Sequence, residues 1–295
     1  MSRVFVVGVD GGASKTDVAL ADVPSEDHRE ARLGPGNVGR RPVPELVDEI
    51  VAAVRRLGGD PADVRAVAAG LAGVDRPGDG RGAESALRVA FPGASVLVVN
   101  DTLLALAGAL GRGGHGLALV AGTGTNCIAR TADGREERIG GEGYRSGDFG
   151  SGRDIAREAA YLAARGRDGR GAPTRLSARL EGVTDDAAIP PIVFRAAADG
   201  DRVARELLIR AGGELGWTAA VLARRAFPEE AWRRAIPLIL AGSLVQRPEP
   251  PNPLVEALVA RARAADPRLE PRVLEGPAVR GAVRLARDLL ESSEA

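Results

Sequence analysis

Two glycine turns with hydroxyl neighbours are the stretches of this sequence best suited to phosphate chemistry. One spans residues 10–16 (DGGASKT) and the other residues 121–126 (AGTGTN). Glycines lack the Cβ atoms that would block a phosphate, and turn amides can point at its oxygens. In the first turn Lys15 and Thr16 would add a charge and a hydroxyl. A hairpin with an ordinary glycine turn explains the first stretch equally well on its own.

Polar side chains also follow the predicted strands. Asp10 ends an apolar run and is placed to hold a metal ion through water, and Asp101 follows the strand predicted over 95–99. The carboxyl ends of strands in open α/β sheets face the ligand crevice, so Asp101 is directed at a site. Alternatively, Asp101 caps the helix predicted over 102–110. The turn at 36–37 offers the amide side chain of Asn37.

Other nucleotide and nucleophile motifs fail on their details. A P-loop needs glycine immediately before the lysine, and Ser14 stands there. Residues 34–39 have dinucleotide-fingerprint spacing, but Pro42 and Pro44 occupy the place where its helix should begin. Cys127 falls in a predicted strand and both histidines fall in predicted loops, which argues against a nucleophile with a histidine base.

The elements that must position these residues are arranged twice. Each half contains three hairpin-like strands followed by helices that alternate with strands, and the glycine-rich junction 111–116 separates the halves. The pattern predicts an α/β sheet built twice, with domains over 1–114 and 115–295 and the last helix a candidate to pack back on the first domain. The later elements are expected as strands 64–71, 117–121, 236–240 and 272–274 and helices 253–264 and 278–290, with Trp217 and Trp232 in the core.

Composition bounds the class of protein. The 295 residues suggest about two domains, and 40 basic residues balance 40 acidic ones, so bulk charge indicates neither a nucleic-acid nor a membrane partner. Cys127 is the single cysteine, which excludes an intramolecular disulfide and a cysteine-based zinc site. No signal-peptide layout and no apolar run of about 18 residues is seen, so we expect a cytoplasmic protein.

Four motifs together carry a family resemblance over nearly the whole chain. Residues 10–16, 100–101, 121–126 and 147–152 (GDFGSG) resemble those of the N-acetylglucosamine kinase and BadF/BadG/BcrA/BcrD ATPase family. That family belongs to the actin, hexokinase and Hsp70 chaperone ATPase superfamily. The resemblance implies an α/β fold of duplicated ribonuclease H-like (actin-like ATPase) domains with a nucleotide cleft between them.

The same resemblance implies an ATP-dependent carbohydrate kinase that uses ATP and Mg²⁺. Asp101 would be the general base and Asp10 would hold the metal. The nucleotide would contact Gly11, Gly12, Lys15, Thr16, Gly122, Thr123, Gly124, Thr125, Ala241, Gly242 and Ser243. An amino sugar, expected to be N-acetylglucosamine, would contact Asn37, Gly73, Asn100, Asp101, Gly141, Glu142 and Asp148. Dimerisation is common among such relatives, but no stretch here indicates an interface.

Departures from the family pattern leave alternatives open. Glu142 and Phe149 stand where sugar kinases of this family carry Trp and Glu, and Ala72 replaces an expected serine. A carboxylate at Glu142 would suit a free amino group, which makes glucosamine a second candidate substrate. A BcrA-type activator needs two cysteines per subunit, and a regulatory nucleotide-binding protein is a further alternative. The choice of sugar, the phosphorylated hydroxyl and the oligomeric state stay open.

Overall fold

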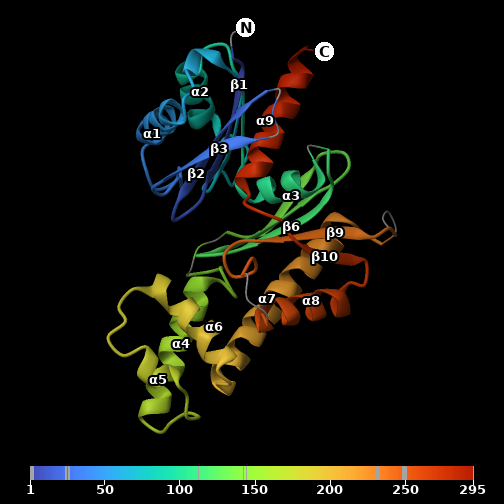
Figure 1. Cartoon of the computed structure of the whole chain (residues 1–295). Coiled ribbons are helices and arrows are strands. Elements are labelled where there is room, and N and C mark those ends of the chain that lie inside the picture. Colours follow the sequence, from blue (N-terminus) through green and yellow to red (C-terminus); the bar gives the residue numbers. More distant parts are fainter. Residues whose placement is uncertain are drawn as a thin grey trace. The chain divides into compact units, whose positions relative to one another are not determined.

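The computed structural model describes residues 3–294 except 24, 26, 112, 142, 144, 230–232 and 248–250. The chain forms two compact units (Figure 1), unit 1 from residues 1–114 together with 274–295, and unit 2 from residues 115–273. The sequence predicts a second domain of 115–295 whose last helix could pack back on the first. In the structure residues 274–295 belong to unit 1.

Unit 1 is built on a mixed five-stranded sheet. Its strands in spatial order are β3 (His28–Leu33), β2 (Thr16–Asp22), β1 (Phe5–Gly11), β4 (Val64–Leu71) and β5 (Ser95–Val99). β2 is antiparallel to both β1 and β3, while β1, β4 and β5 run parallel. β1 is apolar and almost wholly buried because helices cover both faces of the sheet.

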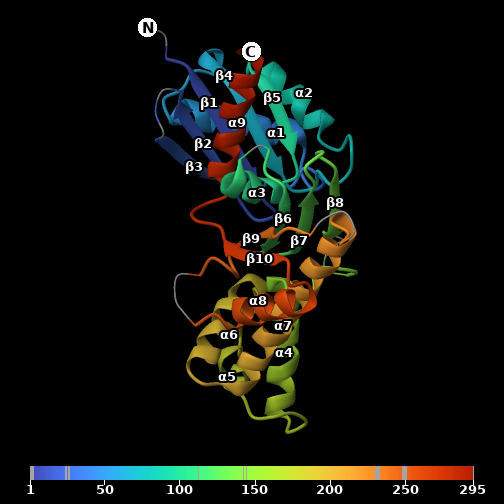
Figure 2. The same cartoon turned by 90° about the vertical axis from the view of Figure 1, so that its right-hand side faces the viewer.

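Two helical layers cover this sheet. α1 (Val43–Arg56) and α2 (Arg81–Ala90) pack on the face that carries Val7 and Val9. α3 (Thr102–Leu110) and α9 (Val279–Glu294) pack on the opposite face, which carries Val6, and Figure 2 shows α9 lying along the strands. A 3₁₀ turn (Pro61–Asp63) leads into β4.

The α9 layer depends on two glycines. A Cβ added at Gly281 would lie 2.0 Å from the carbonyl oxygen of Leu104 in α3, and one added at Gly8 would lie 2.6 Å from the amide nitrogen of Val283 in α9. Since real Cβ atoms do not approach backbone so closely, only glycine lets α9 reach both α3 and β1.

Unit 2 repeats the sheet of unit 1. Its strands in spatial order are β10 (Leu269–Val273), β9 (Ile236–Ala241), β6 (Gly116–Ala121), β7 (Thr125–Arg130) and β8 (Glu136–Gly140). β6, β7 and β8 are antiparallel neighbours, and β6, β9 and β10 are parallel. The strand order and directions match those of unit 1, which confirms the duplicated α/β topology.

Helix α7 (Arg202–Ala226) covers β6, β7 and β8. α8 (Pro253–Ala265) packs closely on α7, where a Cβ at Gly212 would lie 2.0 Å from the Leu254 carbonyl oxygen. The remaining helical segments of unit 2 are α4 (Gly152–Arg167), α5 (Leu176–Arg179), a 3₁₀ turn (Asp186–Ala188) and α6 (Ile189–Ala198). None of the helices in the described part of the chain combines the length and apolar character needed to cross a membrane.

Three expectations were wrong. His28 was expected in a loop, but it begins strand β3 and pairs with Ala21 of β2. Trp217 does not lie in the core: it is 41% exposed, and the guanidinium carbons of Arg224 and Arg261 lie 5.0 Å and 4.8 Å from its ring centroid. The final strand covers 269–273 rather than 272–274, because it is an edge strand whose exposed side chains hide the apolar pattern. Trp232 lies outside the described residues.

Candidate active site

Two aspartates stand at strand ends of the unit 1 sheet. Asp10 lies near the end of β1, and Asp101 lies between β5 and α3. The parallel strands β1, β4 and β5 end at one edge, which is the ligand-binding edge in α/β sheets. Side chains alternate along a strand, so Asp10 projects on the same side as Val6, toward the α3 and α9 layer. The side chain of Asp10 therefore points toward the helical layer that contains α3, and Asp101 lies immediately before α3.

The carboxylates of Asp10 and Asp101 lie within electrostatic range of each other. Burial raises the pKa of Asp10 to about 6, the charge of Asp17 adds to the rise, and Lys15 opposes it. Burial raises the pKa of Asp101 to about 7, with the charges of Asp10 and Asp75 as further causes. Because each extra negative charge disfavours ionisation, a cation beside these carboxylates would lower both pKa values.

The donor set fits Mg²⁺ held jointly by protein and substrate. Carboxylate oxygens are the hard ligands that Mg²⁺ prefers, and it is usually bound by one or two carboxylates, waters and phosphates. Among the described residues no group of three or more His, Cys, Asp or Glu side chains could hold a metal alone. Asp10, with Asp101 nearby, therefore fits a metal site that a nucleotide would complete.

Asn100 caps α3 in place of its neighbour. The Oδ1 atom of Asn100 accepts a hydrogen bond from the Thr102 amide at 3.0 Å, and its Nδ2 donates to the Val74 carbonyl oxygen at 3.0 Å and to Asp75 at 3.1 Å. Asp101 holds the N-cap position but makes no side-chain capping hydrogen bond. Hydrogen bonds from the backbone and the side chain of Thr102 oppose the rise in the pKa of Asp101, so the helix start stays an alternative role for this carboxylate beside a chemical one.

The first glycine turn is fixed by backbone hydrogen bonds. The Gly12 amide donates to the Lys15 carbonyl oxygen at 2.9 Å, and the Gly36 amide donates to the Gly12 carbonyl oxygen at 2.9 Å. Gly11 packs beneath, since a Cβ there would lie 2.6 Å from a methyl carbon of Leu71. Thr16 is fully buried and donates its hydroxyl to the Gly34 carbonyl oxygen at 2.9 Å. The Thr16 hydroxyl thus donates its proton to the neighbouring loop. The side chain of Lys15, by contrast, is half-exposed.

Three predicted sugar contacts lie in neighbouring loops of unit 1. Gly73 has a left-handed φ of 90°, and a Cβ there would lie 2.8 Å from Oδ1 of Asn37. The same oxygen accepts from the Gly39 amide at 2.9 Å, which orients the Asn37 amide group. Asn100 holds the residues that follow Gly73 through its bond to Val74. The structure therefore brings Asn37, Gly73 and Asn100 together.

The second glycine turn connects β6 and β7 in unit 2. The Gly122 amide donates to the Gly124 carbonyl oxygen at 3.0 Å, and the Gly122 carbonyl oxygen accepts from the Gly152 amide at 2.8 Å. Thr123 accepts from the Arg153 amide at 3.3 Å. The first turn of α4 therefore holds this turn in place, while Gly122, Thr123, Gly124 and Thr125 stay partly exposed.

The loop after β9 lies against the second turn. Gly242 has a φ of 99°, and a Cβ there would lie 2.3 Å from the Ala121 carbonyl oxygen. That oxygen accepts from the Leu244 amide at 3.1 Å, and Ser243 is exposed beside Gly122. Of the predicted nucleotide residues of unit 2, those at 122–125 and at 242–243 thus lie together at the surface, whereas Ala241 is buried beneath them.

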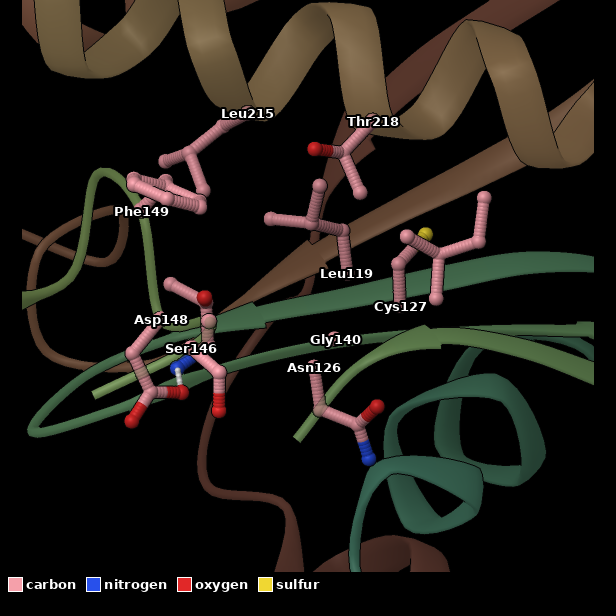
Figure 3. A pocket seen from close by; sticks show the side chains of 12 residues that line it. Leu119, Asn126, Cys127, Gly140, Ser146, Asp148, Phe149, Leu215 and Thr218 are labelled. Atoms are coloured by element: carbon pink, nitrogen blue, oxygen red, sulfur yellow. Dashed lines mark hydrogen bonds between the residues drawn. The ribbon is translucent and has the colours of Figure 1, made fainter. Parts of the chain in front are cut away.

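Asp148 is built into the same turn. It is buried and is the one non-glycine residue of the described chain with a positive φ, 58°. Its Oδ1 atom accepts from the Thr125 amide at 3.0 Å, shown as the dashed line in Figure 3. A left-handed conformation costs energy in a residue other than glycine, less for aspartate than for most, and such residues are enriched at functional sites. The structure therefore places Asp148 against the β6 to β7 turn.

A cavity of about 230 Å³ lies beside Asp148, between the sheet and α7. In Figure 3, Leu119 and Cys127 point from the sheet toward Leu215 and Thr218 of α7, whereas Asp148 and Asn126 point to the other side. Gly140 is part of the lining, and Gly141 follows with a φ of 73°. Glu142, a predicted sugar contact, lies outside the described residues.

Two acidic residues near the aspartate pair were not predicted. Asp17 faces Asp10 across the first hairpin, and Asp75 lies within electrostatic range of Asp101. The hairpin centre offered a signal for Asp17, because residues equally far from that centre pair across the strands. Nothing in the sequence marked Asp75, whose proximity depends on the long-range contact of its loop with Asn100.

Residues 7–265 match the BadF/BadG/BcrA/BcrD ATPase family. The chain belongs to this family. The resemblance carried by the four motifs is confirmed, as is the two-sheet α/β architecture that it implies.

Relatives of this BadF/BadG/BcrA/BcrD family member include sugar kinases. An N-acetylmuramic acid/N-acetylglucosamine kinase from Clostridium acetobutylicum is 31% identical over 235 residues, which cover 72% of this chain and 76% of the relative. A protein assigned as an N-acetylglucosamine kinase in Chromobacterium violaceum is 26% identical, with a TM-score of 0.70 over 98% of this chain and all of that one. A ROK family glucokinase from Streptomyces griseus is 21% identical and shares the fold, with a TM-score of 0.64 over 98% and 99% of the two chains.

The lone cysteine of this family member is not placed for cluster or nucleophile chemistry. Cys127 is buried on β7, and burial strongly raises the pKa of its thiol. A thiolate is the form that binds metals and attacks electrophiles, so such a thiol is inert. A cluster built from two cysteines of each subunit cannot form with one cysteine per chain.

Proposed function

We propose that this chain is an ATP-dependent kinase that transfers the γ-phosphoryl group to a hydroxyl of an amino sugar, with N-acetylglucosamine as the acceptor. The observation that supports the proposal is that Asp10 and Asp101 both stand at the ends of parallel strands of the unit 1 sheet, within electrostatic range of each other. Family membership and the sugar kinases among the relatives support the reaction class.

Asp101 would act as the general base. Its pKa of about 7, raised first by burial, suits a group that must accept a proton near neutral pH. Asp101 would take the proton of the acceptor hydroxyl as that oxygen forms its bond to the γ-phosphorus and the bond to the β-phosphate oxygen breaks. The attacking oxygen gains the phosphoryl group, and ADP leaves with the bridging oxygen.

Asp10 would hold Mg²⁺ through water. When bound, the ion would neutralise phosphate charge, which is the main demand of phosphoryl transfer. The amides at Gly11 and Gly12 and the ammonium of Lys15 would contact the phosphates from unit 1. Residues 122–125 and the loop residues Ala241, Gly242 and Ser243 would bind the nucleotide from unit 2.

The sugar would be held by Asn37, Gly73, Asn100 and Asp148, with Gly141 and Glu142 as further contacts. Asn37 is already oriented by Gly39, so its amide loses little freedom when it binds a sugar hydroxyl. Prearranged polar groups of this kind supply the orientation that the transfer needs.

Sugar-dependent ADP release tests the proposal. With ATP and Mg²⁺, we expect turnover on N-acetylglucosamine, measured beside glucosamine, N-acetylmannosamine, N-acetylmuramic acid and glucose. Preference for glucosamine would select the alternative that Glu142 suggests. ATP binding without turnover on any of these sugars would contradict the kinase and favour a regulatory ATPase.

A further inference from the structure

A row of charged side chains crosses three strands of unit 1 beside the first glycine turn. Asp10 on β1 lies opposite Asp17 on β2, and Asp17 lies opposite Arg32 on β3. Residues paired across neighbouring strands project from the same face of a sheet. The three side chains therefore form one continuous row.

Asp17 is the centre of this row. It is 4% exposed and accepts hydrogen bonds from Nζ of Lys15 at 2.5 Å and from Nε of Arg32 at 2.7 Å, with a longer one at 3.4 Å from the Arg32 Nη2 atom. Burial alone would raise the pKa of Asp17, but the hydrogen bonds from Arg32 and Lys15 outweigh burial and lower it. Asp17 is therefore a charged anchor at neutral pH.

Lys15 and Arg32, the two cations that bind Asp17, differ in where they lie and in how exposed they are. The side chain of Arg32 is 67% exposed on the edge strand, whereas Lys15 sits in the glycine turn with its side chain 50% exposed. An ammonium carries three N–H donors and Asp17 occupies one of them. Lys15 thus keeps donors for an anionic ligand at the turn while its position is fixed.

We propose that Asp17 is a positioning residue, which holds the Lys15 ammonium beside the glycine turn so that it meets the nucleotide phosphates. Arg32 holds Asp17 from the opposite side. The inference rests on the proposed function, since it assumes a nucleotide at this turn. A lysine anchored at folding has already lost its rotamer freedom, so nucleotide binding does not have to order it.

Steady-state kinetics of Asp17→Asn give the first test. Asparagine keeps the shape of the side chain but loses the charge that holds Lys15. We expect the KM for ATP to rise by roughly 3- to 10-fold, the factor that ordering one long side chain represents, with kcat within about twofold. Asp22→Asn is the matched control, because Asp22 is also an aspartate of β2 and pairs with Arg29 at 3.6 Å away from the turn.

Lysine-selective ¹³C labelling gives a readout that activity does not. Lys15 is the only lysine of the chain, so the labelled protein has a single lysine side-chain signal. We expect Asp17→Asn to move this signal toward that of free lysine, and Asp22→Asn to leave it in place. The non-hydrolysable analogue AMP-PNP should shift the signal of the parent protein, whereas adenosine should not.

Opposite results would overturn the positioning role. These are an unchanged KM for ATP in Asp17→Asn, a loss confined to kcat, or binding of AMP-PNP by calorimetry without any change in the Lys15 signal. The labelling arm needs no sugar. A protein that binds nucleotide but phosphorylates no sugar would contradict the kinase proposal while still testing Asp17.

Discussion

At the scale of single residues, Asp101 combines exposure to ligand with an environment that resists its charge. The residue is partly exposed, while burial and the charges of Asp10 and Asp75 raise the pKa of its carboxyl group. An ionised carboxylate in this position lowers the free energy of unfolding, because burial and the neighbouring negative charges disfavour its charge. Two predictions separate its chemical role from its cost in stability.

Asp101→Asn should abolish most turnover while nucleotide binding is kept. Removal of a positioned general base typically reduces kcat about 100- to 10,000-fold, and asparagine cannot accept the proton. ADP release measures the loss, and calorimetry with AMP-PNP measures binding. Asp133→Asn, a change of the same type in the exposed turn before β8, is the control. Equal turnover of Asp101→Asn and the parent would remove Asp101 from the mechanism.

The same substitution should stabilise the metal-free protein at high pH. The pKa of Asp101 is about 7 in the folded chain against an ordinary value of 3.8, so the folded state binds more protons between these values. The free energy of unfolding therefore falls as pH rises from about 4 to 7. We expect Asp101→Asn to be more stable than the parent by about 1 to 3 kcal/mol at pH 8.

Denaturant unfolding at pH 8 and pH 4 checks this stability prediction. The difference between Asp101→Asn and the parent should shrink toward zero at pH 4, where the parent carboxyl is protonated. Asp133→Asn should show no gain at pH 8, because hydrogen bonds from Thr131 and Arg135 lower the pKa of Asp133. A gain for Asp101→Asn that is equal at both pH values would contradict a charge-based cause.

At the scale of elements, close helix packing through glycine is a repeated device. Gly212 of α7 faces the Leu254 carbonyl oxygen of α8, whereas a Cβ at the adjacent Gly213 would meet no atom within 4 Å. The two neighbours share one helix and differ in what faces them, so they form a matched pair.

Gly212→Ala should destabilise the protein by about 2 kcal/mol or more, because the added methyl group overpacks the α7 to α8 contact. Gly213→Ala should instead stabilise it by about 0.5 to 1 kcal/mol through helix propensity. Thermal unfolding of both variants checks the pair. A loss of the same size in both would show that helix propensity and packing had been assigned wrongly.

Much of the element pattern follows from the sequence. The strand 64–71 and the helix 102–110 were predicted with the bounds that the structure has, because the first is apolar except for Arg65 and the second follows a strand-end aspartate. β10 was misplaced because Pro271 and the exposed charges of Glu270 and Arg272 mask an edge strand. The prediction of Trp217 in the core was wrong, because the guanidinium groups of Arg224 and Arg261 lie over its exposed ring and stabilise it there.

The site was predictable only where chemistry coincides with a local motif. Asp10 and the glycine turns are visible in short stretches, and Asp101 follows from the strand-end rule. The buried bond from Thr16 to Gly34 and the capping of α3 by Asn100 depend on contacts between distant segments. Sequence periodicity does not report such contacts, so their roles required the structure.

At the scale of the whole molecule, the two units share a strand order but differ in continuity. Unit 2 is one uninterrupted segment, whereas unit 1 is made from two segments separated by all of unit 2. α9 supplies part of the unit 1 core, with Val279, Ala282 and Val283 against Val6 and Ala68 of the sheet. Unit 1 is therefore incomplete without residues that come after unit 2.

We expect this arrangement to set an order of folding during synthesis. Domains usually fold from the N-terminus as the ribosome releases them, but here the sheet of unit 1 must wait for α9 with one apolar face partly uncovered. Unit 2 ends at residue 273, so all of its strands are synthesised before α9. Ribosome-tethered chains that expose residues 1–273 should show a protease-resistant unit 2 and a protease-sensitive unit 1. Because α9 is synthesised last, we expect unit 1 to complete its folding after unit 2, although most of unit 1 is synthesised first. A chain that ends before α9 would therefore lack the complete sheet that positions Asp10 and Asp101.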